Sequence, residues 1–238
     1  MKVKNRLLNF DKVIYQDDDW FKFSIDSVLL ANFVTINLKC RKIMDLCCGN
    51  APIPMLLSCR TKAFIDGIEL QKCVYDLGVL SIKENNLDSQ INLINDDVRN
   101  IKNFFSSDSY DTVVCNPPYF KTEDGGYFNN NSVKSIARHE VMVTLDDIVK
   151  NSSYLLKTGG NFAMVHRSER FFEILDCLKK YRLEPKKIQF IYPKSNYNSD
   201  LFLIEATKNG KIGLKVFPPI VIHNDDDSYT EYVKSLFD

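Results

Sequence analysis

The chain of 238 residues lacks any apolar run that approaches the ~18 consecutive residues of a membrane-spanning helix. Its first residues, Met1 to Arg6, are basic and lack the apolar stretch of a signal peptide. Internal repeats and low-complexity tracts are also missing. With a hydrophobic fraction of 45%, the sequence predicts one globular domain with a substantial core and no membrane segment.

Metal-binding and disulfide spacings are absent too. The seven cysteines include no C-x-x-C pair, and most lie in apolar segments, where a reduced thiol behaves as a small hydrophobe. The three histidines, His139, His166 and His223, are too scattered in the sequence to suggest a metal site, and His166 is expected to be a hydrogen-bonded structural residue. We therefore expect a cytoplasmic protein with reduced core thiols, no metal and no disulfide.

Net charge is absent as well, since 31 Lys and Arg residues balance 31 Asp and Glu residues. A neutral chain argues against indiscriminate nucleic-acid binding but leaves room for a local basic face. The charge is unevenly distributed along the sequence, with lysines and an arginine clustered in 179–187 and three aspartates in 225–227.

What the sequence does contain is an alternation of short β-rich runs with longer helical runs, which is typical of a parallel sheet wrapped by helices. The predicted strands are 42–47, 63–69, 91–96, 110–115, 161–166, 188–193 and 200–206. The predicted helices are 24–38, 51–59, 71–86, 144–157 and 168–181. This order predicts an α/β, Rossmann-like doubly wound sheet of seven strands, mostly parallel with an antiparallel last strand. We expect a single domain over 1–238, made of a leading segment (1–40), a core (41–207) and a C-terminal tail (208–238).

The most informative segment is Asn116-Pro117-Pro118-Tyr119, directly behind the predicted strand 110–115. The prolines fix φ at about −65° and remove backbone donors, so the loop is rigid and presents bare carbonyls. The Asn116 amide oxygen and the neighbouring carbonyl can accept two hydrogen bonds from one planar amino group, while the Tyr119 ring offers a face for stacking. Such a loop suits methyl transfer to adenine, cytosine or a glutamine amide. Alone, it is also compatible with a proline-rich turn after a buried strand.

Acidic residues at the ends of three predicted strands indicate a site for an adenosine-bearing ligand. Asp45 and Gly49 lie around the turn after the first strand, where backbone N–H groups can approach a ligand at a helix N-terminus. Glu69 closes the second strand, at a position where a carboxylate accepts hydrogen bonds from ribose hydroxyls. Asp97 follows the third strand and can accept from an adenine amino group, with the Val98 N–H serving a ring nitrogen. Each residue alone is more often a cap or turn residue, but the ordered set is hard to assign to chance.

These motifs make the chain resemble the class I S-adenosylmethionine-dependent methyltransferases, and within them the amino-methylating group with an Asn-Pro-Pro-Tyr loop. The first motif of that family usually reads Asp-x-Gly-x-Gly-x-Gly. Here Cys47 and Ala51 replace the glycines on either side of Gly49, and close approach of the ligand remains plausible if their φ angles are negative. The resemblance implies S-adenosylmethionine as cofactor. The implied cofactor site includes Asp45, Cys47, Gly49, Glu69, Asp97, Val98 and Asn116.

The segment from Phe21 to Leu30 narrows the resemblance to the bacterial tRNA1(Val) adenine-37 N6-methyltransferase family, which modifies the purine 3′ of the anticodon. In that family the segment covers the methionine end of the cofactor, which places Asp26 in the site, although Asp26 is equally well explained as a helix N-cap. The segments 137–140, 165–167 and 193–195 are also similar to that family. The resemblance extends from about residue 10 to about residue 210, and it implies methylation of the exocyclic amino group of adenine 37 in the tRNA anticodon loop.

The same resemblance implies roles for the residues of the acceptor site. Asn116 and the Pro117 carbonyl would accept the amino hydrogens in a metal-free reaction, and Tyr119, with Phe120, would stack on an adenine flipped out of its loop. An exposed basic residue is more often merely solvated, but some are candidates for phosphate contacts with the tRNA partner. These candidates are Arg138, Arg167, Lys194 and the basic run 179–187.

Three alternatives stay open. A protein glutamine methyltransferase acting on release factors shares the Asn-Pro-Pro-Tyr loop, but few residues precede Lys42 where such enzymes carry a helical domain. A DNA adenine methyltransferase would need a target-recognition domain, and only the 120–143 connection and a short tail are available. The replaced glycines suggest a catalytically silent RNA-binding or cofactor-sensing module, against which the intact Glu69 and Asp97 argue.

Overall fold

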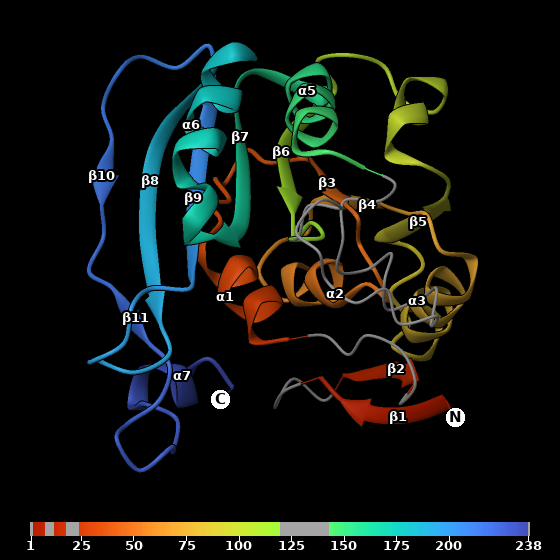
Figure 1. The fold of residues 1–238 in the computed structure, drawn as a ribbon. Helices are drawn as coiled ribbons and strands as arrows, with labels where there is room; N and C mark the ends of the chain where they lie inside the picture. The colour runs from red at the N-terminus through yellow and green to blue at the C-terminus, as the bar shows by residue number, and fades with distance from the viewer. Residues whose placement is uncertain (1, 8–11, 18–23, 120–142, 238) are drawn as a thin grey trace.

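The computed structural model describes residues 2–7, 12–17, 24–119 and 143–237 (Figure 1). Phe120, Arg138 and His139 lie outside these described residues. Strands and helices alternate through most of the chain, as the sequence predicts. The strands of the main sheet are β3 (Lys42–Leu46), β4 (Phe64–Glu69), β5 (Ile91–Asn95), β6 (Tyr110–Cys115), β7 (Leu156–Arg167), β8 (Leu183–Tyr192), β9 (Leu201–Lys208), β10 (Lys215–Val216) and β11 (Ile220–Val221).

The order of the main sheet is β10-β8-β9-β7-β6-β3-β4-β5, with β11 also pairing with β8. Among the described strands of this sheet, only β9 runs antiparallel to its neighbours, β7 and β8. The predicted fold class is therefore confirmed: a mostly parallel α/β sheet with an antiparallel last core strand. The short strands β10 and β11 extend the seven predicted strands along the β8 edge, so part of the expected C-terminal tail belongs to the sheet (Figure 1).

Helices cover both faces of the sheet because alternate residues of each central strand point to opposite sides. On β3, Ile43 belongs to the core cluster that contains residues of α1 (Ile25–Phe33), α2 (Pro52–Ser58) and α3 (Lys72–Glu84). Met44 belongs to the opposite cluster, which contains residues of α5 (Leu145–Leu155) and α6 (Phe171–Lys180). Two 3₁₀ helices, η1 (Val98–Asn103) and η2 (Ser168–Arg170), follow β5 and β7. This double-sided core holds the carboxyl ends of β3, β4, β5 and β6 at one edge of the sheet.

The helix boundaries differ from the sequence prediction by one to five residues, and two helix ends are informative. The helix α1 ends at Phe33, five residues before the predicted end, and α5 ends at Leu155, with Leu156 already extended. Gly159 has a φ of 83°, but it lies inside β7 beside the irregular pairing with β6. Gly159 therefore serves a bend in a strand.

A two-stranded antiparallel sheet, β1 (Lys2–Arg6) and β2 (Val13–Asp17), was not predicted. Side chains of α3 hold it in place: Asn85 accepts the N–H of Val13 and Ser81 accepts the N–H of Tyr15, each at 2.9 Å. Asn50, which follows Gly49, donates its side-chain amide to the Tyr15 carbonyl at 2.8 Å. The hairpin is thus attached to the turn where the cofactor is expected.

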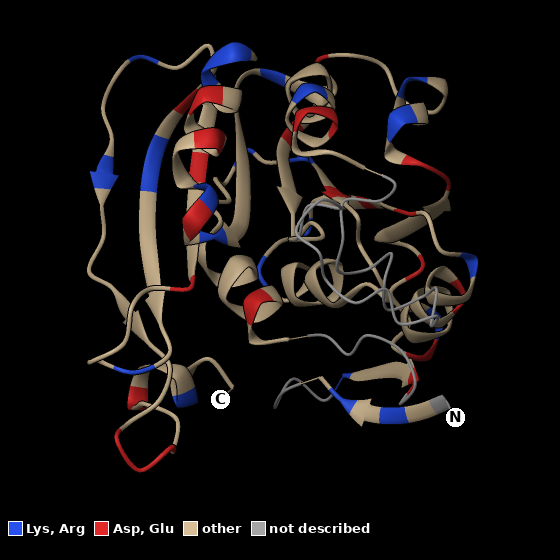
Figure 2. Ribbon diagram, viewed as in Figure 1, with Lys and Arg blue, Asp and Glu red and all other residues tan. Residues whose placement is uncertain are grey.

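Charged residues of both signs are interspersed over the fold (Figure 2). The basic run 179–187 does not form one surface. Lys180 pairs with Asp146 of α5 at 2.5 Å, whereas Lys187 donates to the Phe33 carbonyl at the end of α1 and lies 3.5 Å from Glu205. Because α1 and α5 cover opposite faces of the sheet, this run cannot act as a single phosphate-binding patch.

Candidate active site

The turn after β3 is built on left-handed backbone conformations. Cys47, Gly49 and Ala51 have φ angles of 60°, 57° and 68°. The condition of negative φ at Cys47 and Ala51 is therefore not met: these residues adopt the conformation that the usual glycines would adopt more easily, at a cost of ~1–2 kcal/mol each. A methyl group built at Gly49 would meet no heavy atom within 4 Å, so the backbone there faces open space.

Glu69, at the end of β4, joins this turn to the next strand. Its carboxylate accepts the N–H of Gly49 at 3.0 Å and the N–H of Gln71 at 2.8 Å. Burial raises the pKa of Glu69, and the backbone donors partly oppose the shift. Two residues chosen separately from the sequence, Gly49 and Glu69, are thereby brought into direct contact.

Asp45, on β3 beside this pair, is fully buried. Neither of its carboxylate oxygens has a hydrogen-bond partner among the residues that the structure describes. Burial, followed by the nearby charge of Glu69, holds the pKa of Asp45 well above its usual range. An unpaired buried carboxylate is costly, so Asp45, beside the Gly49 turn, indicates a donor that is supplied from outside the chain.

Asp97, after β5, is engaged by its own neighbour. Its carboxylate caps η1 through the Arg99 N–H at 2.8 Å and pairs with the Arg99 guanidinium at 2.5 Å. The pKa of Asp97 is lowered, because the hydrogen bonds and charge of Arg99 outweigh the opposing effect of burial. Val98 is buried beside it. Asp97 is therefore a helix cap in this structure, and its contact with the adenine ring of a cofactor remains a prediction.

The Asn116 loop forms a closed network with the start of α1. The Tyr119 hydroxyl lies 2.6 Å from Asn116 Oδ1 and 3.0 Å from Asp26 Oδ2, and the Asn116 amide donates to the Ser27 hydroxyl at 3.3 Å. A phenol has one proton, so Tyr119 donates to one of the two oxygens at a time. In this state the oxygen expected to accept the target amino group is already occupied by Tyr119.

Burial shifts both ionisable groups of this network, Asp26 and Tyr119, toward their protonated forms. Burial raises the pKa of Asp26, against hydrogen bonds from Ser24 and Tyr119 that lower it. Burial and then the charge of Asp26 hold the pKa of Tyr119 well above its usual range, so the phenol keeps its proton. Asp26 does not cap α1, because Ser24 occupies the N-cap position. The structure thus brings Asp26 to the predicted acceptor loop.

His166, at the end of β7, is a site neighbour that sequence reasoning placed in a structural role. Its ring centroid lies 5.5 Å from that of Tyr119. The ring is fully buried, and burial lowers the pKa of His166 to about 3. Ser27 is a second missed residue, although it belongs to the same 21–30 segment that suggested Asp26.

Two of the described candidates for phosphate contacts, Arg167 and Lys194, are already paired within the chain. Arg167 donates to Glu169 at 2.8 Å, and Lys194 lies 2.8 Å from the Asp227 carboxylate. Surface pairs of this kind contribute little and exchange readily, so they leave both residues able to meet a phosphate. Their contact with RNA stays a prediction.

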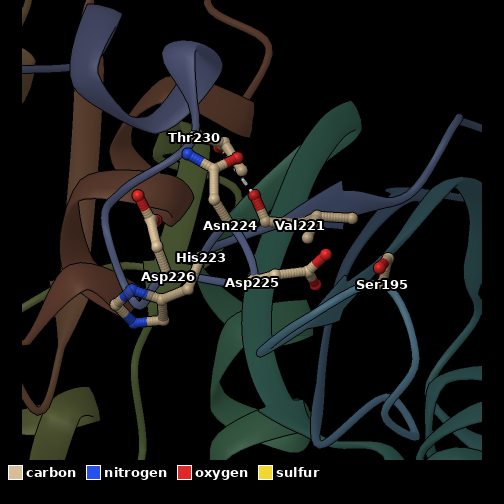
Figure 3. Close-up of a pocket in the computed structure, with 7 residues that line it drawn as sticks. All are labelled: Ser195, Val221, His223, Asn224, Asp225, Asp226 and Thr230. Atoms are coloured by element: carbon tan, nitrogen blue, oxygen red, sulfur yellow. Dashed lines mark hydrogen bonds between the residues drawn. The ribbon is translucent and has the colours of Figure 1, made fainter.

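A cavity of about 410 Å³ lies elsewhere, between the β8–β9 connection and the C-terminal residues (Figure 3). Thr230 donates to the Val221 carbonyl at 2.8 Å on one side of it. Its lining consists of Ser195, Val221, His223, Asn224, Asp225, Asp226 and Thr230. None of these is a predicted site residue, and no group of three metal-ligating side chains occurs in the described part of the chain.

The pattern of the site agrees with comparisons to known proteins. A family model described as Eco57I restriction-modification methylase matches residues 33–202, which is most of the chain. The chain belongs to this methylase family. Within the family match lie all the strand ends described above, from Asp45 to the Asn116 loop. No helix in the described ranges is both long and apolar enough to cross a membrane.

Several curated relatives of this methylase share a name. A tRNA1(Val) (adenine(37)-N6)-methyltransferase of Aliivibrio salmonicida is 23% identical over 89% of this chain and 87% of its own length. One of the same name from Parabacteroides distasonis is 26% identical over 86% of this chain and 85% of its own length. The resemblance stated from the sequence is therefore confirmed.

Solved structures share the fold. A predicted O-methyltransferase from Agrobacterium tumefaciens superposes with a TM-score of 0.70 at 20% identity, covering 89% of this chain and 95% of its own. Geranyl diphosphate C-methyltransferase from Streptomyces coelicolor A3(2), solved with S-adenosyl-L-homocysteine, gives a TM-score of 0.58 at 15% identity over 76% of each chain. The methylase thus has the sheet of known methyltransferases.

Proposed function

We propose that the chain is an S-adenosylmethionine-dependent methyltransferase that acts on the exocyclic amino group of an adenine in the tRNA anticodon loop, at position 37. The observation that carries the proposal is the Asn116-Pro117-Pro118-Tyr119 loop at the end of β6, beside the carboxylates at the ends of β3 and β4. The names of curated relatives that match most of the chain support tRNA as the substrate. A cytoplasmic location follows from that substrate.

The residues at the ends of β3 and β4 fit the cofactor. Open space at Gly49 leaves room for a ligand against the backbone, and Asp45 offers two unpaired carboxylate oxygens to donors of that ligand. Glu69 is held by two N–H groups in a position to accept ribose hydroxyls. When bound, S-adenosylmethionine supplies an electrophilic methyl group on its sulfonium. Asp97 and Val98 would lie toward the adenine ring of the cofactor.

The Asn116 loop would orient the acceptor nitrogen. Asn116 Oδ1 and the Pro117 carbonyl accept the two amino hydrogens, which keeps the nitrogen lone pair directed away from the ring plane and toward the methyl group. Tyr119 must first release Asn116 Oδ1, since its hydroxyl occupies that oxygen at 2.6 Å. The freed phenol ring then provides the stacking face for a flipped base.

The test is methyl transfer from radiolabelled S-adenosylmethionine by the full chain, with three acceptors in parallel: tRNA that lacks this modification, duplex DNA, and a release factor. We expect label only in tRNA, recovered as N6-methyladenosine after digestion to nucleosides. The Asn116→Ala variant should lose at least about a hundredfold in kcat while it keeps its affinity for the cofactor.

Asn32→Ala is the matched control, because Asn32 is an exposed residue of α1 whose side-chain amide donates to the Val28 carbonyl of the same helix. It should retain wild-type turnover. Label in DNA or in a glutamine side chain would replace the proposal with one of the alternatives. Cofactor binding without transfer to any acceptor would favour a catalytically silent module.

A further inference from the structure

The end of β7 places His166 next to the Asn116 loop. Cys115 of β6 pairs with Met164 of β7 in parallel register, so His166 lies level with Pro117, the residue whose carbonyl is expected to accept from the target amino group. The Tyr119 ring lies 5.5 Å from the His166 ring and inclined at 52° to it. His166 is therefore part of the wall behind Tyr119.

The hydrogen bonds of His166 define its tautomer. The Arg167 backbone N–H donates to His166 Nδ1 at 2.8 Å, so Nδ1 is an acceptor and the neutral ring carries its proton on Nε2. Burial keeps the pKa of this ring at about 3, so it is a neutral donor at physiological pH. Nε2 has no hydrogen-bond partner among the described residues although the side chain is fully buried. A buried N–H without a partner is costly and indicates a group that meets its acceptor in another state.

Tyr119 covers both groups that a base would need. Its hydroxyl occupies Asn116 Oδ1, and its ring lies against His166. A movement of Tyr119 would therefore leave two residues next to it free to meet a base, one with an acceptor for an amino group and one with a neutral N–H donor. Adenine presents this complementary pair, an amino donor flanked by ring nitrogens that accept, on both its N1 and its N7 sides. Guanine presents an oxygen acceptor in place of the amino group.

We propose that His166 is a specificity-determining residue, which donates its Nε2–H to a ring nitrogen of the target adenine once Tyr119 has left its resting position. The inference rests on the proposed function and names the contact that distinguishes the base. Asn116 and Pro117 accept hydrogen bonds from the amino group, while His166 donates one to an unprotonated ring nitrogen beside that group. A base without that acceptor would leave the buried Nε2–H unpaired.

The experiment uses anticodon stem-loop RNA with adenosine, 1-deazaadenosine or 7-deazaadenosine at position 37, each of which keeps the amino group. Wild type should lose at least about tenfold in kcat/KM on one of the two analogues, since one hydrogen bond is removed. His166→Phe should lose a similar factor on adenosine and should no longer distinguish adenosine from that analogue. His166→Gln, which places an amide N–H near the position of Nε2, should recover part of the lost activity and of the discrimination.

Cofactor affinity and folding, measured by equilibrium binding and circular dichroism, should be unchanged in these variants. His223→Phe is the matched control, because His223 lies at the separate cavity of Figure 3. Equal rates of the wild-type protein on adenosine and on both analogues would overturn the role of His166 whether or not the variants fold. So would undiminished discrimination in folded His166→Phe, and in either case the proposed function would stand. Absence of methylation on every RNA by wild type would instead remove the proposed function, and this inference with it.

Discussion

Glu69 accepts the backbone N–H of Gly49 at 3.0 Å, which ties the end of β4 to the turn that follows β3. The contact joins two residues that are 20 positions apart and that each belong to the expected cofactor site. Burial raises the pKa of Glu69, so its carboxylate depends on the donors that surround it. This pair therefore determines both the shape of the turn and the acceptors it offers to a ligand.

Replacing Glu69 by Gln should weaken cofactor binding by about tenfold or more, because one ribose acceptor becomes a donor and the charge-assisted bonds are lost. The dissociation constant for S-adenosylmethionine, measured by calorimetry, checks this. Glu84→Gln is the matched control, since Glu84 pairs with Lys4 on the exposed surface. Equal affinities in the two variants would remove Glu69 from the cofactor site.

Alanine substitutions at Gly49 and Gly159 distinguish backbone strain from steric exclusion of the cofactor. Both have positive φ, and a methyl group built on either meets no atom within 4 Å. Alanine at each position should lower the free energy of unfolding by about 1–2 kcal/mol. Only Gly49→Ala should also weaken cofactor binding, because its methyl would enter the ligand's space. A comparable loss of affinity in Gly159→Ala would show that the effect is general strain.

Removing the Tyr119 hydroxyl tests whether it competes with the substrate. Tyr119→Phe keeps the ring for stacking and frees Asn116 Oδ1, so the KM for tRNA should fall by about three- to tenfold. Tyr119→Ala should instead raise KM, because the stacking face is lost. Steady-state kinetics at saturating cofactor measure both. An increased KM in Tyr119→Phe would mean that the hydroxyl serves the bound state.

His166 should make the folded state sensitive to acid. Its pKa falls from 6.5 to about 3 on folding, so below pH 6.5 the unfolded chain binds a proton that the folded chain excludes. The stability associated with the neutral ring is fully present above pH 6.5 and is lost as the pH falls toward 3, by about 2–3 kcal/mol at pH 4.5. Urea unfolding of wild type and of His166→Phe between pH 4.5 and 7.5 isolates this contribution. Parallel pH profiles would show that the ring titrates normally.

Local sequence patterns are sufficient to predict the layered sheet and the strand ends. The apolar run of each buried strand and the carboxylate at its end can both be read within a few consecutive residues. The hairpin of β1 and β2 was missed because its stability comes from distant partners, Ser81 and Asn85 on α3. The strands β10 and β11 have two residues each, too few for a recognisable alternation.

The individual site residues could be chosen from the sequence, but their contacts could not. Nothing local to Asn116 indicates that Tyr119 folds back onto it or that Asp26, 93 residues away from Tyr119, joins the network. Nε2 of His166 is unpaired because the Arg167 backbone N–H donates to the other ring nitrogen, Nδ1. That contact is set by the folded backbone and cannot be read from the sequence. For the same reason, side-chain size alone could not indicate that Cys47 and Ala51 have left-handed φ angles.

The position of the methyl group in tRNA tests the central claim most directly. Unmodified tRNA1(Val) transcript should be methylated by the chain, digested with a base-specific nuclease, and its fragments measured by mass spectrometry. The account predicts one added methyl group, in the fragment that contains adenine 37, recovered as N6-methyladenosine and absent when that base is guanine. A methyl group on any other nucleotide, or an unmodified transcript in the presence of bound cofactor, would contradict it.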